Sequence, residues 1–322
     1  MLLFIHDEAS PGLRPFGGAS QWWLDKSLAA LAARIAAAGG QLALRAGASA
    51  DVLPAIIAET GADSVFWNRR YQKAERDLDG AIMDALKASG VAVSSFNGRL
   101  LNEPWQIETG AGGDYKVFTP YWKAVKARYR APDALPAPTS LAGPDVASDT
   151  LSDWNLHPTR PDWADGLAAT WTPGEAGAME RLSDFLDSPV NAYAEARNRP
   201  DIDTGTSRLS PHLRFGEIGP AQVWRAVRHG VESGRVDEAG AMTFLSEIGW
   251  REFSYSLLFH NPDLASENYN PDFRHMPWRS DRVAYQAWCR GETGYPIVDA
   301  GMRQLWQTGF MHNRVRMIVA SF

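Results

Sequence analysis

Short apolar strands alternate with helical segments in the first hundred residues, and this order constrains the fold more than any other feature. The strand signals are LLFIHDE, QLALRAG, SVFWNR and VAVSSFN, at residues 2–8, 41–47, 64–69 and 91–97. Helices are predicted between them, over roughly residues 20–38, 50–60 and 71–89. Such alternation is typical of βαβ units around a parallel sheet. We therefore predict a Rossmann-like α/β domain, although no G-x-G-x-x-G fingerprint follows its first strand.

A proline-rich stretch over residues 131–165 has the composition of a linker. After it the strand signal disappears, and the predicted helices span residues 174–187, 190–197, 220–233, 238–260, 283–291, 296–307 and 312–322. The length of 322 residues suits two domains with separate cores. We therefore divide the chain into an α/β domain (1–125), a linker (126–165) and an all-α domain (166–322).

The composition indicates a globular protein, because 45% of the residues are hydrophobic. No apolar run reaches the length of a membrane span, and the N-terminal sequence has no secretory signal. The single cysteine, Cys289, excludes an internal disulfide framework and a cysteine metal cluster. We expect a cytoplasmic monomer with no bound metal and no membrane partner.

Charge is distributed unevenly along the chain. The net charge is −6, yet residues 206–322 contain thirteen Arg and no Lys against twelve acids. Arginine favours fixed, bidentate contacts to phosphate over diffuse attraction. A general preference for arginine in an alanine-rich protein is the alternative explanation.

The segment TGTSRLSPHLRFGE, Thr204 to Glu217, places hydroxyls and an arginine just before a short helix. Ser210 is predicted as the N-cap, Pro211 as the first helical residue and Gly216 as the end. Free N–H groups at a helix start hold anions, and hydroxyls and guanidinium suit phosphate oxygens. The segment is therefore either a phosphate loop or simply a well-capped turn.

The predicted helix at residues 238–260 carries Glu247, Trp250, Arg251 and Ser254 at positions i, i+3, i+4 and i+7. On a helix these positions share one face, which makes a poor core and a suitable ligand wall. The alternative is a surface pair of Glu247 with Arg251 beside a partly exposed Trp250. Gly249 leaves a gap on a neighbouring face, where another group approaches closely.

The last predicted helix places Asn313, Arg316 and Met317 on one face, with Arg314 pointing elsewhere. An asparagine amide offers both a donor and an acceptor to a base edge, and methionine offers an adaptable surface. Alone, this pattern is a weak indication of nucleic-acid binding.

Together these segments resemble the photolyase–cryptochrome family of blue-light flavoproteins. The motifs that carry the resemblance are GGASQWWLDKSLAAL (17–31), YKVFTPYW (115–122), TGTSRLSPHLRFGEI (204–218), SEIGWREF (246–253) and GYPIVDAGMRQLWQTGFMHNRVRMIVASF (294–322). The resemblance implies an α/β antenna domain, a long linker and an all-helical domain that holds FAD. It also predicts a fragment that lacks the family's first strand and its C-terminal part.

The resemblance assigns roles to individual residues. Those expected to bind FAD are Tyr193, Thr206, Ser207, Arg208, Leu209, Ser210, Glu247, Arg251 and Arg316. Those expected to contact DNA are Arg197, Trp250, Asn313 and Arg314. Trp278 matches the solvent-side tryptophan of the electron-transfer chain, and an antenna pigment of the folate or deazaflavin type is left open.

Four positions indicate the subgroup within the family. Members that repair cyclobutane pyrimidine dimers hold the lesion with a Glu, a Trp, an Asn and a Met, and here these are Glu247, Trp250, Asn313 and Met317. Histidines replace the last two in (6-4) repair enzymes, and plant-type cryptochromes usually carry Asp at the position of Asn313. The resemblance therefore implies a carbon–carbon lyase that repairs UV-damaged DNA in light. The alternatives are a cryptochrome-type photoreceptor and a flavin-free binding module.

Overall fold

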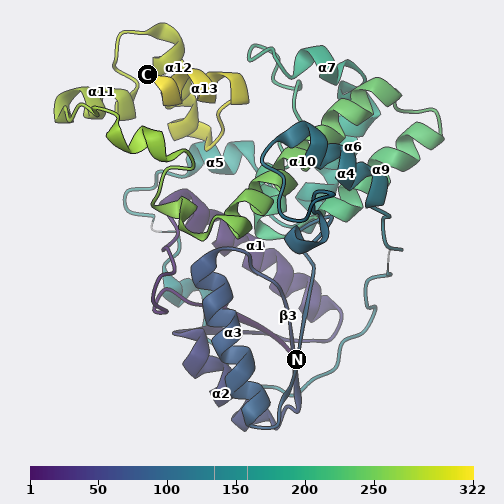
Figure 1. The fold of residues 1–322 in the computed structure, drawn as a ribbon. Coiled ribbons are helices and arrows are strands. Elements are labelled where there is room, and N and C mark those ends of the chain that lie inside the picture. The colour runs from purple at the N-terminus through teal and green to yellow at the C-terminus, as the bar shows by residue number, and fades with distance from the viewer. Residues whose placement is uncertain (134, 158) are drawn as a thin grey trace.

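The four predicted strands form where the sequence places them, in a computed structural model that describes residues 1–133, 135–157 and 159–322 (Figure 1). The strands are β1 (Leu2–His6), β2 (Leu42–Ala46), β3 (Ser64–Asn68) and β4 (Ala92–Phe96). The helices between them are α1 (Gly18–Ala37), α2 (Ser49–Thr60) and α3 (Lys73–Ala88). The predicted α/β domain is therefore confirmed.

The strands pair in parallel, as two separate pairs. β1 pairs with β2, from Leu2 opposite Leu42, and β3 pairs with β4, from Ser64 opposite Ala92. The crossovers α1 and α3 make both pairs parallel, as βαβ units require. Within the described residues no hydrogen-bonded ladder joins β1 to β3, so the simplest expectation of one continuous sheet is not met.

The rest of the chain is helical, as predicted. Its α-helices are α4 (Phe118–Arg128), α5 (Asp165–Thr170), α6 (Glu175–Asp187), α7 (Tyr193–Ala196), α8 (Ser210–Phe215), α9 (Pro220–Glu232), α10 (Glu238–His260), α11 (Arg282–Arg290), α12 (Pro296–Thr308) and α13 (Asn313–Ser321). Short 3₁₀ turns are η1 (Pro104–Gln106), η2 (Leu151–Trp154), η3 (Pro189–Ala192), η4 (Pro262–Ala265) and η5 (Pro271–His275). Among the described residues, no helix combines the length and the apolar character that a bilayer crossing needs.

The largest core surrounds α10. Phe244 and Ile248 of α10 pack in one cluster with Tyr121 and Val125 of α4 and Phe185 of α6. Helix α4 therefore packs with the helical part of the chain. The division into 1–125, 126–165 and 166–322 stays a prediction.

Helix α1 ties the α/β domain to the helical domain through buried tryptophans. Trp22 and Trp23 pack with Trp171, which follows α5. The Trp23 indole donates a 2.9 Å hydrogen bond to Glu217, which also accepts the Gly174 N–H at 2.7 Å. One buried carboxylate thus joins three segments that are far apart in the sequence.

The linker is docked over part of its length. It passes along the α/β domain and returns to the helical part (Figure 1). The Leu44 N–H of β2 donates to the Ser148 hydroxyl at 2.9 Å, and the Asp149 N–H donates to the Leu44 carbonyl at 2.8 Å. Ala46 N–H donates to the Asp149 carboxylate at 2.8 Å. The edge of β2 that faces away from β1 is therefore covered.

Candidate active site

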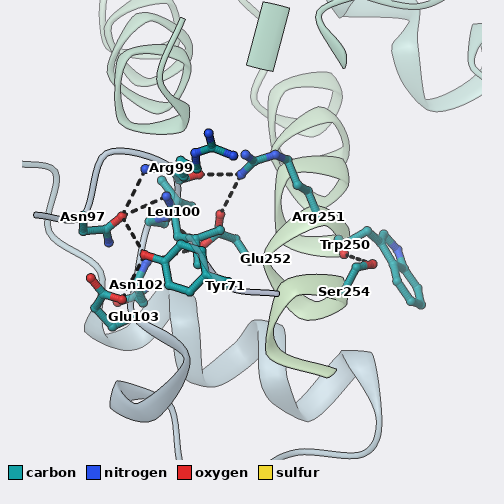
Figure 2. Close-up of polar contacts among 11 residues, drawn as sticks. Tyr71, Asn97, Arg99, Leu100, Asn102, Glu103, Trp250, Arg251, Glu252 and Ser254 are labelled. Atoms are coloured by element: carbon teal, nitrogen blue, oxygen red, sulfur yellow. Dashed lines mark hydrogen bonds and ion pairs between the residues drawn. The ribbon is translucent and has the colours of Figure 1, made fainter. Parts of the chain in front are cut away.

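Helix α10 does not present its four predicted residues as one wall. Figure 2 shows the Arg251 side chain directed to the loop around Arg99, with Trp250 on the other side of the helix. Arg251 Nη1 donates a 2.6 Å hydrogen bond to the Arg99 carbonyl, and the Ser254 hydroxyl donates to the Trp250 carbonyl at 2.8 Å. Consecutive helical residues point about 100° apart, so Arg251 separates from Trp250 once it finds this acceptor.

Neighbouring aromatic rings support the Trp250 side chain and explain why residue 249 is a glycine. The Trp250 indole stacks on Phe118 with ring centroids 3.8 Å apart and an interplanar angle of 11°. It remains 46% exposed, which leaves surface for a further stacked ring. A Cβ on Gly249 would lie 2.5 Å from the Trp122 indole. The close approach predicted at Gly249 is therefore made by Trp122.

Glu247 pairs with Arg197, which follows α7, and not with Arg251. The ion pair is partly buried, so it is screened less than a surface pair. Tyr193 lies one turn before Arg197 and packs edge-to-face on Phe185 and Phe244. Burial raises the pKa of the Tyr193 phenol. The ion pair between Arg197 and Glu247 thus connects the end of α7 to α10, on the side where Tyr193 enters the core.

Helix α13 begins at Asn313, which is exposed, as is Met317 one turn later. The Arg314 guanidinium donates to the Asn198 side-chain oxygen at 2.9 and 2.6 Å, and its Nη1 lies 3.7 Å from the Met317 sulfur. Arg314 was expected to point away from this face. It lies beside Met317 because residues three apart are neighbours on a helix. Arg316 is also exposed.

Helix α8, which follows the predicted phosphate loop, begins one position earlier than the sequence indicates. Leu209 occupies the N-cap position, so Ser210 is the first helical residue and Pro211 the second, and no side chain caps the helix. Proline is tolerated there because the first N–H groups of a helix have no intrahelical partner. Gly216 ends the helix with φ 76°, as predicted.

Arg208 is held in an unusual conformation in this loop. Its φ of 51° lies in the left-handed region, which costs a non-glycine residue about 1 kcal/mol. Its guanidinium covers the Phe310 ring at 4.7 Å and contacts Asp203 at 3.2 Å. Its Nε is buried with no partner among the described residues. An unsatisfied cationic donor beside the Thr206 and Ser207 hydroxyls fits a phosphate group.

The remaining predicted residues are distributed as follows. Leu209 is buried in the main core, so only its backbone is available to a ligand. Trp278 is 77% exposed in the segment before α11, which suits a solvent-side position. The structure thus brings together Arg197 with Glu247 and Arg314 with Met317, and it leaves Arg251 and Trp278 elsewhere.

Sequence reasoning missed Glu252, which is only 1% exposed in α10. Its carboxylate accepts the backbone N–H groups of Leu101 at 2.7 Å and Asn102 at 3.3 Å, across the two domains. Burial raises its pKa to about 8, against the opposing effect of Arg251. Figure 2 shows Glu252 beside Tyr71, whose hydroxyl donates to Glu103 at 2.9 Å. The sequence signal that could have revealed a buried Glu252 was its position on α10, one helical turn after the buried Ile248.

Two family models match the chain. Residues 1–139 match the DNA photolyase model, and residues 244–322 match the FAD binding domain of DNA photolyase. The second match includes α10 from Phe244 onward and all of α13.

Known proteins match along almost the whole chain. It is 49% identical over 310 residues to the deoxyribodipyrimidine photo-lyase of Agrobacterium fabrum, covering 96% of this chain and 64% of that protein. It is 33% identical over 328 residues to cryptochrome-1 of Arabidopsis thaliana, covering 99% of this chain and 48% of the relative. The structure of a class III photolyase from Agrobacterium tumefaciens superposes with a TM-score of 0.95 at 47% identity, covering 100% of this chain and 66% of that one. The chain therefore spans about two thirds or less of these relatives.

Proposed function

Because the chain belongs to the photolyase–cryptochrome family, we propose that the protein repairs cyclobutane pyrimidine dimers in DNA by light-driven electron transfer. The observation that carries the proposal is the pair Asn313 and Met317, exposed one turn apart on α13. These are the residue types found in the subgroup that repairs this lesion. UV-damaged DNA is the proposed partner, and deoxyribodipyrimidine photo-lyase activity is the proposed activity.

FAD is the proposed cofactor, and the phosphate loop is the part of the chain that fits it. The buried, unpartnered Nε of Arg208 is the kind of donor that a diphosphate would satisfy. The residues proposed to hold the cofactor are Tyr193, Thr206, Ser207, Arg208, Leu209, Ser210, Glu247 and Arg316. When bound and reduced, FAD supplies the electron that light transfers to the dimer. Trp278 is the proposed solvent-side member of the chain that reduces it. Arg251 also belongs to this proposed set, since its Nη1 binds the Arg99 carbonyl and its guanidinium has further N–H donors.

The chain's own side chains bind and orient the lesion in this proposal. Photolyases act on a base that has left the duplex, and a damaged pair costs less to unstack. The exposed surface of Trp250, with Phe118 behind it, offers a stacking platform. The Asn313 amide matches the carbonyl and N–H edge of a pyrimidine, and Met317 supplies an uncharged surface. Glu247, held by Arg197, is positioned to accept a pyrimidine N–H.

The cryptochrome-type photoreceptor is the second candidate. The match to cryptochrome-1 of Arabidopsis thaliana over 99% of the chain favours it. Asn313 argues against it, because plant-type cryptochromes usually carry Asp at that position. A cytoplasmic location and a monomeric state belong to the proposal for either candidate.

The test is illumination of flavin-loaded protein with oligonucleotides that carry one defined lesion. We expect thymine absorbance to recover from the cyclobutane dimer and not from the (6-4) product. Asn313→Ala should weaken dimer binding about five- to a hundred-fold, since a lost buried hydrogen bond costs ~1–3 kcal/mol. Repair of neither lesion, with flavin absorbance intact, would favour the photoreceptor.

A further inference from the structure

Helix α13, which carries Asn313 and Met317, is capped at its start by a histidine. His312 occupies the N-cap position, and its Nδ1 accepts the backbone N–H of Arg314 at 3.2 Å. This N–H is one of the four at a helix start that have no intrahelical partner. The usual N-cap residues are Ser, Thr, Asp and Asn, which all keep their acceptor oxygen near neutral pH. The cap of α13 differs from these because an imidazole can be protonated there.

The backbone on both sides of His312 is fixed. Its side chain is only 5% exposed, and Met311 before it and Val315 after it lie in one buried apolar cluster. The Arg316 N–H donates to the His312 carbonyl at 2.8 Å, within the first turn of the helix. A Cβ on Gly301 of α12 would lie 2.5 Å from Val315, so α12 packs closely against this turn. The imidazole is therefore held at the helix start by its neighbours in the chain.

The surroundings of the ring suit its neutral form. Because Nδ1 accepts a hydrogen bond, the neutral ring carries its proton on Nε2, which is buried and has no partner of good geometry among the described residues. The groups beside the ring are the Arg314 guanidinium and the Arg197 carbonyl, and the Glu247 carboxylate is already paired with Arg197. Within the part of the chain that the structure describes, no ion pair includes His312.

Protonation of His312 would break the cap. The added proton occupies Nδ1, so the ring can no longer accept the Arg314 N–H. The added charge also lies at a helix N-terminus, where the backbone already carries partial positive charge. Burial lowers the pKa of His312 below its usual 6.5, and Arg314 lowers it further, against an opposing effect of the Arg197 carbonyl. The ring is therefore neutral at pH 7 and caps the helix.

We propose that neutral His312 is a positioning residue of the proposed lesion site, and that its protonation releases the first turn of α13. That turn carries Asn313 and Arg314, so both side chains lose their fixed origin when the cap is lost. The Arg314 guanidinium also donates to the Asn198 side-chain oxygen at 2.9 and 2.6 Å, which links this turn to the segment after α7. His312 is buried and acts through these neighbours. The inference rests on the proposed repair function, because that function assigns Asn313 and Arg314 to DNA.

Nitrogen NMR of the histidine side chains tests the cap without DNA or flavin. We expect His312 to carry its proton on Nε2 at pH 7 and to titrate with a pKa below 6.5. The protection factor of the Arg314 amide against hydrogen exchange should fall about three- to tenfold as the ring is protonated. A proton on Nδ1 at pH 7, or a protection factor that does not change with protonation, would overturn the proposal.

Binding of an oligonucleotide that carries one thymine cyclobutane dimer tests the positioning role between pH 5 and 7.5. His312→Asn keeps a side-chain acceptor at the N-cap and cannot be protonated, so it should retain the wild-type affinity at pH 7.5. At pH 5 the wild type should bind about three- to tenfold more weakly than this variant. His312→Ala should bind more weakly than His312→Asn by the same factor at both pH values. His275→Asn is the matched control, because His275 is exposed in η5, and it should keep the pH dependence of the wild type.

The outcomes separate the positioning role from the proposed function. Equal pH dependence in the wild type and in His312→Asn would show that His312 does not position the lesion site. A wild type that fails to prefer the lesion over undamaged DNA at pH 7.5 would instead overturn the proposed function. The ring titration and the Arg314 amide would still decide whether His312 controls the start of α13.

Discussion

The Glu252 carboxylate of α10 accepts a 2.7 Å hydrogen bond from the backbone N–H of Leu101, which lies 151 residues earlier in the chain. This contact holds α10 against the loop after β4, because the N–H of the next residue of that loop, Asn102, donates to the same oxygen at 3.3 Å. Helix α10 also carries Glu247 and Trp250. The domain interface and the proposed lesion site therefore share one rigid element.

Glu252 should make the stability of the protein fall as pH rises. Its pKa is about 8 in the folded protein, against 4.5 as its ordinary value. Between these values the folded state binds more protons than the unfolded state, so stability is highest below about pH 4.5 and is lost up to about pH 8. The slope from this group is at most about 1.4 kcal/mol per pH unit. Glu252→Gln should flatten the dependence of the urea midpoint on pH between 5 and 8, and an unchanged slope would contradict this assignment.

Gly249→Ala should destabilise the protein by about 1–3 kcal/mol, because the new methyl group would overlap the Trp122 indole. Gly80→Ala in α3 is the matched control, since a methyl group there meets no atom within 4 Å. It should stabilise by about 0.5–1 kcal/mol through helix propensity. Urea midpoints of both variants measure the difference, and equal shifts would count against the close contact.

Trp23→Phe should cost about 1–2 kcal/mol, because it removes the hydrogen bond from the indole to buried Glu217. Trp306→Phe is the control, because Trp306 is 83% exposed and packs little surface. Thermal melting compares the two variants. A similar loss in both would mean that the Glu217 contact contributes nothing specific to domain attachment.

Arg314→Ala should weaken binding to damaged and undamaged DNA alike. It should also reduce the salt slope, which is the steepness with which the logarithm of the binding constant falls with the logarithm of the salt concentration, by roughly one unit. Arg197→Ala should reduce the slope less, because Glu247 already neutralises Arg197 in the free protein. Fluorescence anisotropy across a salt series measures both slopes. A change in lesion preference at constant slope would show that neither residue acts as a simple phosphate contact.

Arg208→Ala combined with Ser210→Ala should release flavin during purification, because the proposed phosphate contacts are lost. Flavin content is read from the absorption spectrum, with Arg290→Ala on α11 as the control. Unchanged flavin content in the double variant would place the diphosphate elsewhere.

The sequence was sufficient where the determining forces are local. Helix α10 was predicted at residues 238–260 and forms over those residues, with Asp237 capping it through the Gly240 N–H. The direction of Arg251 was not predictable, because its acceptor, the Arg99 carbonyl, is 152 residues away. Helix α8 starts one residue before the predicted position, and the sequence does not distinguish the two starts because the first four N–H groups of a helix have no intrahelical partner for proline to remove. Residue roles at the proposed flavin and DNA sites remain predictions.

The docked part of the linker also affects how the molecule avoids self-association. An open strand edge is a template on which another chain can add, and the Ser148–Asp149 segment occupies that template along β2. Proteolytic nicking between residues 150 and 165 would leave this cover attached upstream, and a cut between residues 131 and 140 would leave it held at Leu141, whose N–H donates to the Ala38 carbonyl at 2.7 Å. We therefore expect neither cut alone to open this edge of β2 to another chain, although both sever the same connection between the domains.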